Sequence, residues 1–173
     1  MIRTWVNIII GFIVFVLLQV LILNNVHLFG IITPFLYIYI ILKLPVDLGH
    51  SLVILISFLL GLIIDIFSNT FGMHAAATAL AGLIRNPLLL GWVDIREIPE
   101  NSIPSYKLMD LYVFFRYVLI ITTIHHAALF IIESFNFFQP LLLIVKILSS
   151  ILFTMLLIGI TEAFNQGTNR NGN

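Results

Sequence analysis

Residues 5–23 read WVNIIIGFIVFVLLQVLIL, and this run decides the class of protein. It carries no charged side chain, and its length is close to the roughly 20 apolar residues that a helix needs to cross a bilayer. The polar stretch Asn24-Asn25-Val26-His27 follows it, without a small-residue cleavage site. We therefore expect a retained membrane helix and not a signal peptide.

The composition of the whole chain agrees with this run. The 173 residues are 61% hydrophobic and 9% charged, with a mean hydropathy of +1.14. A soluble domain carries roughly 25% charged residues because water must wet its surface. Eight basic and eight acidic residues give no net charge and no indication of nucleic-acid binding, and the absence of cysteine excludes thiolate metal sites and disulfides. The sequence predicts an all-α integral membrane protein.

Long apolar runs continue along the chain and predict a single transmembrane domain over residues 1–164. Five runs are clear, and a sixth, over residues 29–44, is short and interrupted by Gly30 and Pro34. That run could cross the membrane or re-enter it. The polar residues 165–173 are expected to form a disordered cytoplasmic tail. The predicted spans cover about 5–23, 29–44, 48–67, 72–92, 111–134 and 141–161.

The positions of the basic residues favour six crossings. Lysine and arginine collect in cytoplasmic loops. Six spans with the N-terminus inside place these basic residues on the cytoplasmic side: Arg3, Lys43, Arg85, Arg96, Lys107, Arg116 and Arg170. If the short run did not cross, four of them would lie outside. We therefore expect a six-helix bundle with both termini cytoplasmic. The inner loop 93–110 contains Pro99 and Pro104, which argue against one continuous helix there.

The third span has a stripe of small and polar residues on one face, and the fourth span has small residues to match it. Small residues allow two membrane helices to approach closely. We expect these two faces to pack together. The stripe consists of Ser57, Gly61, Asp65 and Ser68, and the matching face of Ala75, Ala79 and Gly82.

Asp65 has two readings that the sequence leaves equally open. A carboxylate at membrane depth is costly and usually marks function. Alternatively, Asp65 lies at the outer interface and caps the helix that begins near Gly72.

Polar residues in the last two spans complete a candidate intramembrane polar network of Asp65, His126, Glu133 and Lys146. Glu133 and Lys146 lie near the outer ends of neighbouring helices, so an ion pair is favoured over snorkelling of Lys146. His125 and His126 are adjacent and point about 100° apart, so they cannot form a helical ligand pair. Hydrogen-bonded histidines inside the bundle are therefore favoured.

Sequence motifs for catalysis, metal binding or phosphate binding are not found. We therefore predict a protein that is not an enzyme and has no cofactor or metal. The inner loop offers a candidate cytoplasmic docking site with Arg96, Glu97 and Lys107.

The stretch GLIIDIFSNTFGMHA at residues 61–75 resembles the signature region of the MreD family of rod-shape-determining membrane proteins. Its family-motif positions are Gly61, Asp65 and Gly72. Thr33-Pro34 also resembles the family, although Phe35 stands where members often have an acid. The stretches 27–45 and 116–138 look like one branch of the family, and length and span pattern fit along the whole chain.

This resemblance implies a fold and a role. The fold would be similar to the substrate-binding membrane subunits of energy-coupling-factor transporters. The protein would act in the bacterial cytoplasmic (inner) membrane as part of the elongation machinery that builds sidewall peptidoglycan. Its partners would be MreC, the actin-like MreB filaments, and RodA with its transpeptidase. No catalytic residue is implied.

Three classes of function remain open at this level. A non-enzymatic scaffold in cell-shape maintenance is the leading hypothesis. A substrate-binding subunit of a vitamin-type transporter is the alternative, although the outer loops are too short to cover a large ligand. An intramembrane enzyme that uses Asp65, Glu133 and a histidine is the third.

Overall fold

The computed structural model describes residues 2–26, 31–93, 98–134 and 139–170. These residues form helices and connecting segments, and no β-strand occurs among them. The elements are α1 (Ile2–Leu21), η1 (Leu23–Asn25), α2 (Ile38–Leu42), α3 (His50–Ser68), α4 (Met73–Leu90), α5 (Tyr106–Met109), α6 (Leu111–Glu133) and α7 (Pro140–Arg170).

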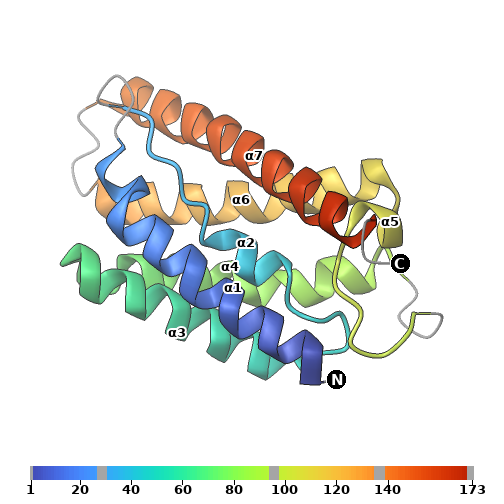
Figure 1. Cartoon of the computed structure of the whole chain (residues 1–173). Coiled ribbons are helices and arrows are strands. Elements are labelled where there is room, and N and C mark those ends of the chain that lie inside the picture. The colour runs from blue at the N-terminus through green and yellow to red at the C-terminus, as the bar shows by residue number, and fades with distance from the viewer. Residues whose placement is uncertain (1, 27–30, 94–97, 135–138, 171–173) are drawn as a thin grey trace.

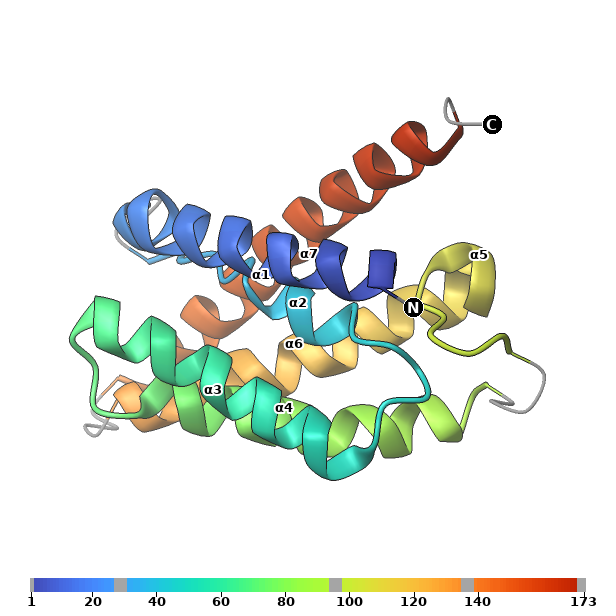
Figure 2. The same ribbon diagram turned by 60° about the horizontal axis from the view of Figure 1, so that its bottom comes forward.

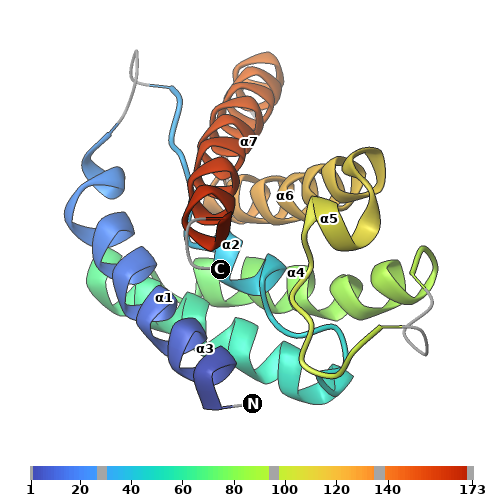
Figure 3. The same ribbon diagram turned by 45° about the vertical axis from the view of Figure 1, so that its right-hand side comes forward.

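The long helices surround a central segment. In the oblique view of Figure 3, α1, α3, α4, α6 and α7 lie around α2. Both chain termini lie at the same end, which we call the terminal end, and the α3–α4 turn lies at the opposite, distal end (Figure 1). Neighbouring helices α3 and α4 run antiparallel and side by side, as Figures 1 and 2 both show.

The surface and the interior have the polarity of a membrane protein. Large apolar side chains cover the outside of α1, α3, α6 and α7, with Ile9 57% and Leu152 70% exposed. Buried polar side chains, including Gln19, Arg85 and His125, lie inside. Among the residues that the structure describes, four helical stretches are long and apolar enough to cross a bilayer: Trp5–Asn25, His50–Ser68, Leu111–Glu133 and Pro140–Asn165. The chain is therefore built as a multi-pass membrane protein.

The second predicted span, over residues 29–44, is not a continuous helix in the structure. Within the described residues 31–44, only Ile38–Leu42 is α-helical, and residues 33–35 have no regular secondary structure. Pro34 lacks an N–H and disfavours helix in the residue before it, which accounts for the break. Nearly every side chain from Thr33 to Leu42 is buried. Non-helical backbone at membrane depth is tolerated where protein surrounds it.

The C-terminal prediction also needs correction. The polar tail was expected to be disordered from residue 165, but α7 continues to Arg170. Pro140 begins this helix at a position where its missing N–H costs nothing. No proline follows it in α7, so the backbone hydrogen bonds propagate beyond the apolar part. In the inner loop, α5 is only four residues long, which agrees with the prediction that Pro99 and Pro104 prevent a continuous helix.

Candidate functional site

The family-motif positions lie on the α3–α4 hairpin, and each has a specific structural task. A Cβ atom built on Gly61 would collide with the backbone of His74 and Ala75, at 2.6 Å from the Ala75 Cα. Only glycine therefore allows the two helices their observed approach. Gly72 is the N-cap of α4 and has φ +79°, a left-handed conformation that glycine adopts without strain. The predicted packing of the two small-residue faces is confirmed here.

Asp65 caps the beginning of α4 from inside the protein. Its side chain is 2% exposed. The Oδ1 atom accepts hydrogen bonds from the Thr70 hydroxyl at 2.5 Å and the His74 N–H at 3.0 Å, and Oδ2 accepts one from the Ala75 N–H at 2.8 Å. Helix N-termini leave backbone N–H groups without partners and favour negative charge. Of the two roles that the sequence left open for Asp65, these hydrogen bonds fit the role of a helix cap.

A cluster of aromatic and imidazole rings fills the centre of the bundle. The Tyr37 hydroxyl lies 2.8 Å from His74 Nδ1 and 2.7 Å from His125 Nε2. A hydroxyl donates one hydrogen bond and accepts others, so it can join two imidazoles of opposite role. The Phe35 ring packs against both of these histidines and His126, with centroid distances of 5.3–5.8 Å. The prediction of hydrogen-bonded histidines inside the bundle is confirmed.

Side chains from distant helices satisfy the backbone of the broken segment. Gln19 Nε2 donates to the Pro34 carbonyl at 3.0 Å, and its Oε1 accepts from the Leu36 N–H at 2.9 Å. From α7, Ser150 Oγ accepts from the Thr33 N–H and Thr154 Oγ1 from the Phe35 N–H, both at 3.1 Å. Buried backbone groups need such partners because no water is available.

The predicted polar network of Asp65, His126, Glu133 and Lys146 is divided into three parts. Asp65 belongs to the α4 cap. His126 lies between the Thr122 carbonyl at 2.8 Å and the Thr154 hydroxyl at 3.0 Å. Glu133 and Lys146 form the expected ion pair at 2.9 Å, but their side chains are 49% and 30% exposed. The pair therefore closes the distal end of α6 and α7 at the surface and not within the core.

The terminal end gathers buried charge that the sequence did not single out. Lys43 Nζ lies 2.7 Å from Glu162 Oε2 and donates to the Pro104 carbonyl at 2.7 Å. The same Glu162 oxygen accepts from the Tyr39 hydroxyl at 2.7 Å. A buried charge needs a partner of this kind, and the triad fixes the end of α2 to α7.

Arg85 clamps the connection between α2 and α3. Its guanidinium is fully buried and donates to the Leu44 carbonyl, to the Pro45 carbonyl at 3.3 Å and to Asn86 Oδ1 at 2.8 Å. The planar, multi-donor guanidinium suits several carbonyls at once. A lone arginine in an apolar run is the sequence signal for such a clamp.

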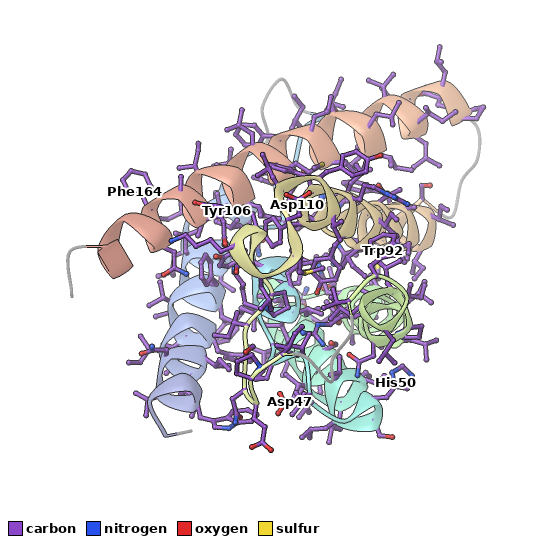
Figure 4. All side chains as sticks on the ribbon, turned by 90° about the vertical axis from the view of Figure 1, so that its right-hand side faces the viewer. Asp47, His50, Trp92, Tyr106, Asp110 and Phe164 are labelled. Atoms are coloured by element: carbon purple, nitrogen blue, oxygen red, sulfur yellow. The ribbon has the colours of Figure 1, made fainter. Side chains whose placement is uncertain are left out.

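The predicted docking loop is described only in part. Lys107 is exposed on α5, whereas Arg96 and Glu97 lie outside the described residues. Figure 4 looks onto this end and shows Asp47 and His50 at the start of α3, Trp92 after α4, and Tyr106 and Asp110 around α5. The exposed Arg116 guanidinium stacks on the Trp92 ring at 4.7 Å, as aromatic and basic residues do at membrane interfaces.

Sequence reasoning missed three features of the site: Gln19, Tyr37 and the Lys43–Glu162 pair. Gln19 carried a signal, because it is the only amide or charged residue in the apolar run 8–23. Within the described residues, no group of three histidine or acidic side chains is arranged to hold a metal ion. Comparisons with protein-family models, with curated proteins and with solved structures find no match.

Proposed function

We propose that this chain is a non-enzymatic membrane scaffold of the MreD type, which maintains bacterial cell shape and supports sidewall peptidoglycan synthesis. The observation that carries the proposal is the task of the three motif residues. Gly61 allows close helix approach, Asp65 caps α4, and Gly72 adopts a left-handed conformation. The residues that resemble the family signature are thus the residues that this hairpin requires.

The proposal includes six crossings of the inner membrane with both termini in the cytoplasm. Two observations support this orientation. Both termini lie at one end of the bundle (Figure 1). The helix bounds place Lys43 just after α2, Arg85 in the second half of α4 and Arg116 near the start of α6, all towards that end. Basic residues mark the cytoplasmic side. Segment 31–42 then makes the second crossing as buried backbone, and α4 makes the fourth.

In this role the bundle links MreC, MreB and the RodA–transpeptidase synthase. The exposed apolar faces of α1 and α7 offer helix surface to membrane partners, and exposed Lys107 offers charge to cytoplasmic ones. The scaffold works by binding, so it needs rigid surfaces and no reacting group.

Depletion of the protein in its rod-shaped host tests the proposal. We expect cells to round and sidewall growth to be disturbed, and we expect the tagged protein to copurify with MreC and RodA. Complementation with Gly61→Leu should fail, whereas Gly159→Ala, at a position with open space around the new Cβ, should restore rods. Normal shape combined with loss of vitamin uptake would assign the chain to the transporter class.

Reporter fusions test the topology separately. Fusions after Asn24 and after residue 135 should report an outer location. Fusions after Asp47, after Glu100 and at residue 173 should report an inner one. An outer signal from the Glu100 fusion would contradict the six-crossing arrangement.

A further inference from the structure

A groove lies between α1 and α7 at the terminal end, and α2 forms its floor. Its volume is about 670 Å³, within the range of ligand sites in proteins. Ile10 and Val14 line it from α1, Tyr39 and Lys43 from the floor, and Phe164 from α7. Figure 4 shows Phe164 projecting from α7 at the edge of the bundle. Because Ile10 and Val14 are about half exposed, the groove opens onto the apolar surface that faces lipid.

Polarity changes along the groove. Asn7 and Asn165, with Lys43, lie at its terminal end, whereas Val14 and Phe15 line it farther into the bilayer. Asn7 and Val14 are separated by two turns of α1, about 10 Å of helix rise. A ligand that matches this gradient has a polar group at one end and hydrocarbon at the other. Membrane lipids are amphipathic in this way, with a polar headgroup and hydrocarbon chains.

The charge of the groove selects among lipids. Lys43 is the only charged residue that lines it among the described residues, and Glu162 compensates Lys43 at 2.7 Å. The remaining polar lining consists of neutral amide and hydroxyl groups: Asn7, Tyr39, Thr161 and Asn165. An anionic headgroup would find no uncompensated positive charge there, whereas a headgroup without net charge is complementary.

We propose that this groove binds one zwitterionic phospholipid from the leaflet on the terminal side. Its headgroup lies beside Asn7, Lys43 and Asn165, and one acyl chain follows Ile10 and Val14. The bound lipid fills the space between α1 and α7 and joins the two helices. This site does not depend on the proposed scaffold function.

Labelling with a photoactivatable phosphatidylethanolamine tests the site. The full chain is placed in nanodiscs that contain the probe, and label is measured on the α7 peptide around Phe164. Gly11 lines the groove, and a Cβ there meets open space, so the Gly11→Phe variant places an aromatic ring at the groove. We expect label on α7 to fall about tenfold, the change given by ~1.4 kcal/mol of binding free energy.

Gly159→Phe is the matched control. It lies on α7 outside this groove, and its Cβ also meets open space. The control should keep the label of the unaltered chain. Equal labelling of the Gly11→Phe variant and the unaltered chain would overturn the proposal.

Competition between unlabelled lipids tests the headgroup. Phosphatidylethanolamine should displace the probe about tenfold better than phosphatidylglycerol in the unaltered chain. Glu162→Gln removes the charge that compensates Lys43, so this variant should shift its preference towards phosphatidylglycerol. Phosphatidylglycerol that competes equally well with the unaltered chain would overturn the zwitterionic assignment.

Crosslinking in cells separates a lipid from a protein occupant. A benzoylphenylalanine at Val14 should yield an adduct of lipid mass. A crosslink to another polypeptide in place of that adduct would overturn the proposal and assign the groove to a partner helix.

Discussion

Segment 31–42 lies at the centre of the bundle and the α3–α4 hairpin is part of the ring of helices around it, and the backbones of these two regions are stabilised in different ways. The hairpin uses its own helical hydrogen bonds, and Asp65 supplies a cap from only nine and ten residues before its partners His74 and Ala75. In segment 31–42, backbone groups of Thr33 and Phe35 bind α7 side chains 117 and 119 positions away. The hairpin depends on local sequence, whereas the broken segment depends on the completed bundle.

This difference predicts where substitutions act. A change in the hairpin disturbs the contact between two helices, but each helix keeps its own backbone hydrogen bonds. A change in Gln19 or Thr154 removes partners from the backbone that precedes α2, where residues 33–35 have no regular secondary structure.

Gln19→Leu should have the largest effect on the free energy of unfolding. It deprives the Pro34 carbonyl and the Leu36 N–H of the hydrogen bonds that Gln19 makes with them, and each buried group left unpaired costs about 1–3 kcal/mol. Unfolding by titration with sodium dodecyl sulfate measures the loss. Asn25→Leu is the control, since that exposed amide binds only the Leu21 carbonyl of the preceding turn. Equal stability of the two variants would mean that Gln19 does not support the segment.

Asp65→Asn tests the hairpin and should destabilise it by about 1.5–3 kcal/mol, the range for a hydrogen bond to a charged group. Asparagine is ordinarily a comparable cap, but both Asp65 oxygens accept bonds from donors here. An amide would direct its NH₂ group at another donor. Asp47→Asn is the control, because the single bond that Asp47 Oδ2 accepts, from the Asn101 N–H, can pass to an amide oxygen. Unchanged stability and rod shape with Asp65→Asn would show that the carboxylate is dispensable.

Thr154→Val should cost about 1–3 kcal/mol, because it keeps the side-chain shape and leaves the Phe35 N–H unpaired. His126 Nε2 loses a partner as well. Thr161→Val provides the matched control on the same helix, where the hydroxyl binds the Leu157 carbonyl one turn earlier. The same detergent titration compares them, and a larger loss from the Thr161 variant would be the contrary result.

Glu133→Gln and Lys146→Met should have the smallest effect, at most about 1 kcal/mol each, because exposed pairs contribute little. A buried pair would lose about 3–5 kcal/mol, but these side chains are 49% and 30% exposed. Exchanging the two charges should restore stability to the original value within that small range. A loss of several kilocalories from either single change would place the pair in a dry environment.

Local sequence rules predict the hairpin well. The spacing of Ser57, Gly61 and Asp65 places them on one helix face and predicts close packing there, although the sequence alone does not decide between a capping and a functional role for Asp65. The Glu133–Lys146 pair follows from matched depth on neighbouring helices. Those features depend on residues that are near in sequence or joined by a short turn.

Long-range pairing explains what the sequence could not reveal. The sequence shows Lys146, Ser150 and Thr154 at a spacing of four. It does not show that the Ser150 and Thr154 hydroxyls accept hydrogen bonds from backbone N–H groups more than 100 residues earlier. Gln19 is visible as a polar residue in an apolar run, yet its partners are backbone groups, which every residue has. Arg85 likewise binds carbonyls, so no complementary side chain indicates its position.

The hydrogen bonds from Thr33 to Ser150 and from Phe35 to Thr154 also determine when segment 31–42 can be completed during synthesis of the chain. Translation produces α7 more than 100 residues after segment 31–42, so these two backbone N–H groups are made before their partners exist. Until α7 is inserted, the segment must remain near water, beside the insertion machinery or against other protein, because lipid cannot satisfy those groups. A helix made later than segment 31–42 therefore completes the hydrogen bonding of that segment.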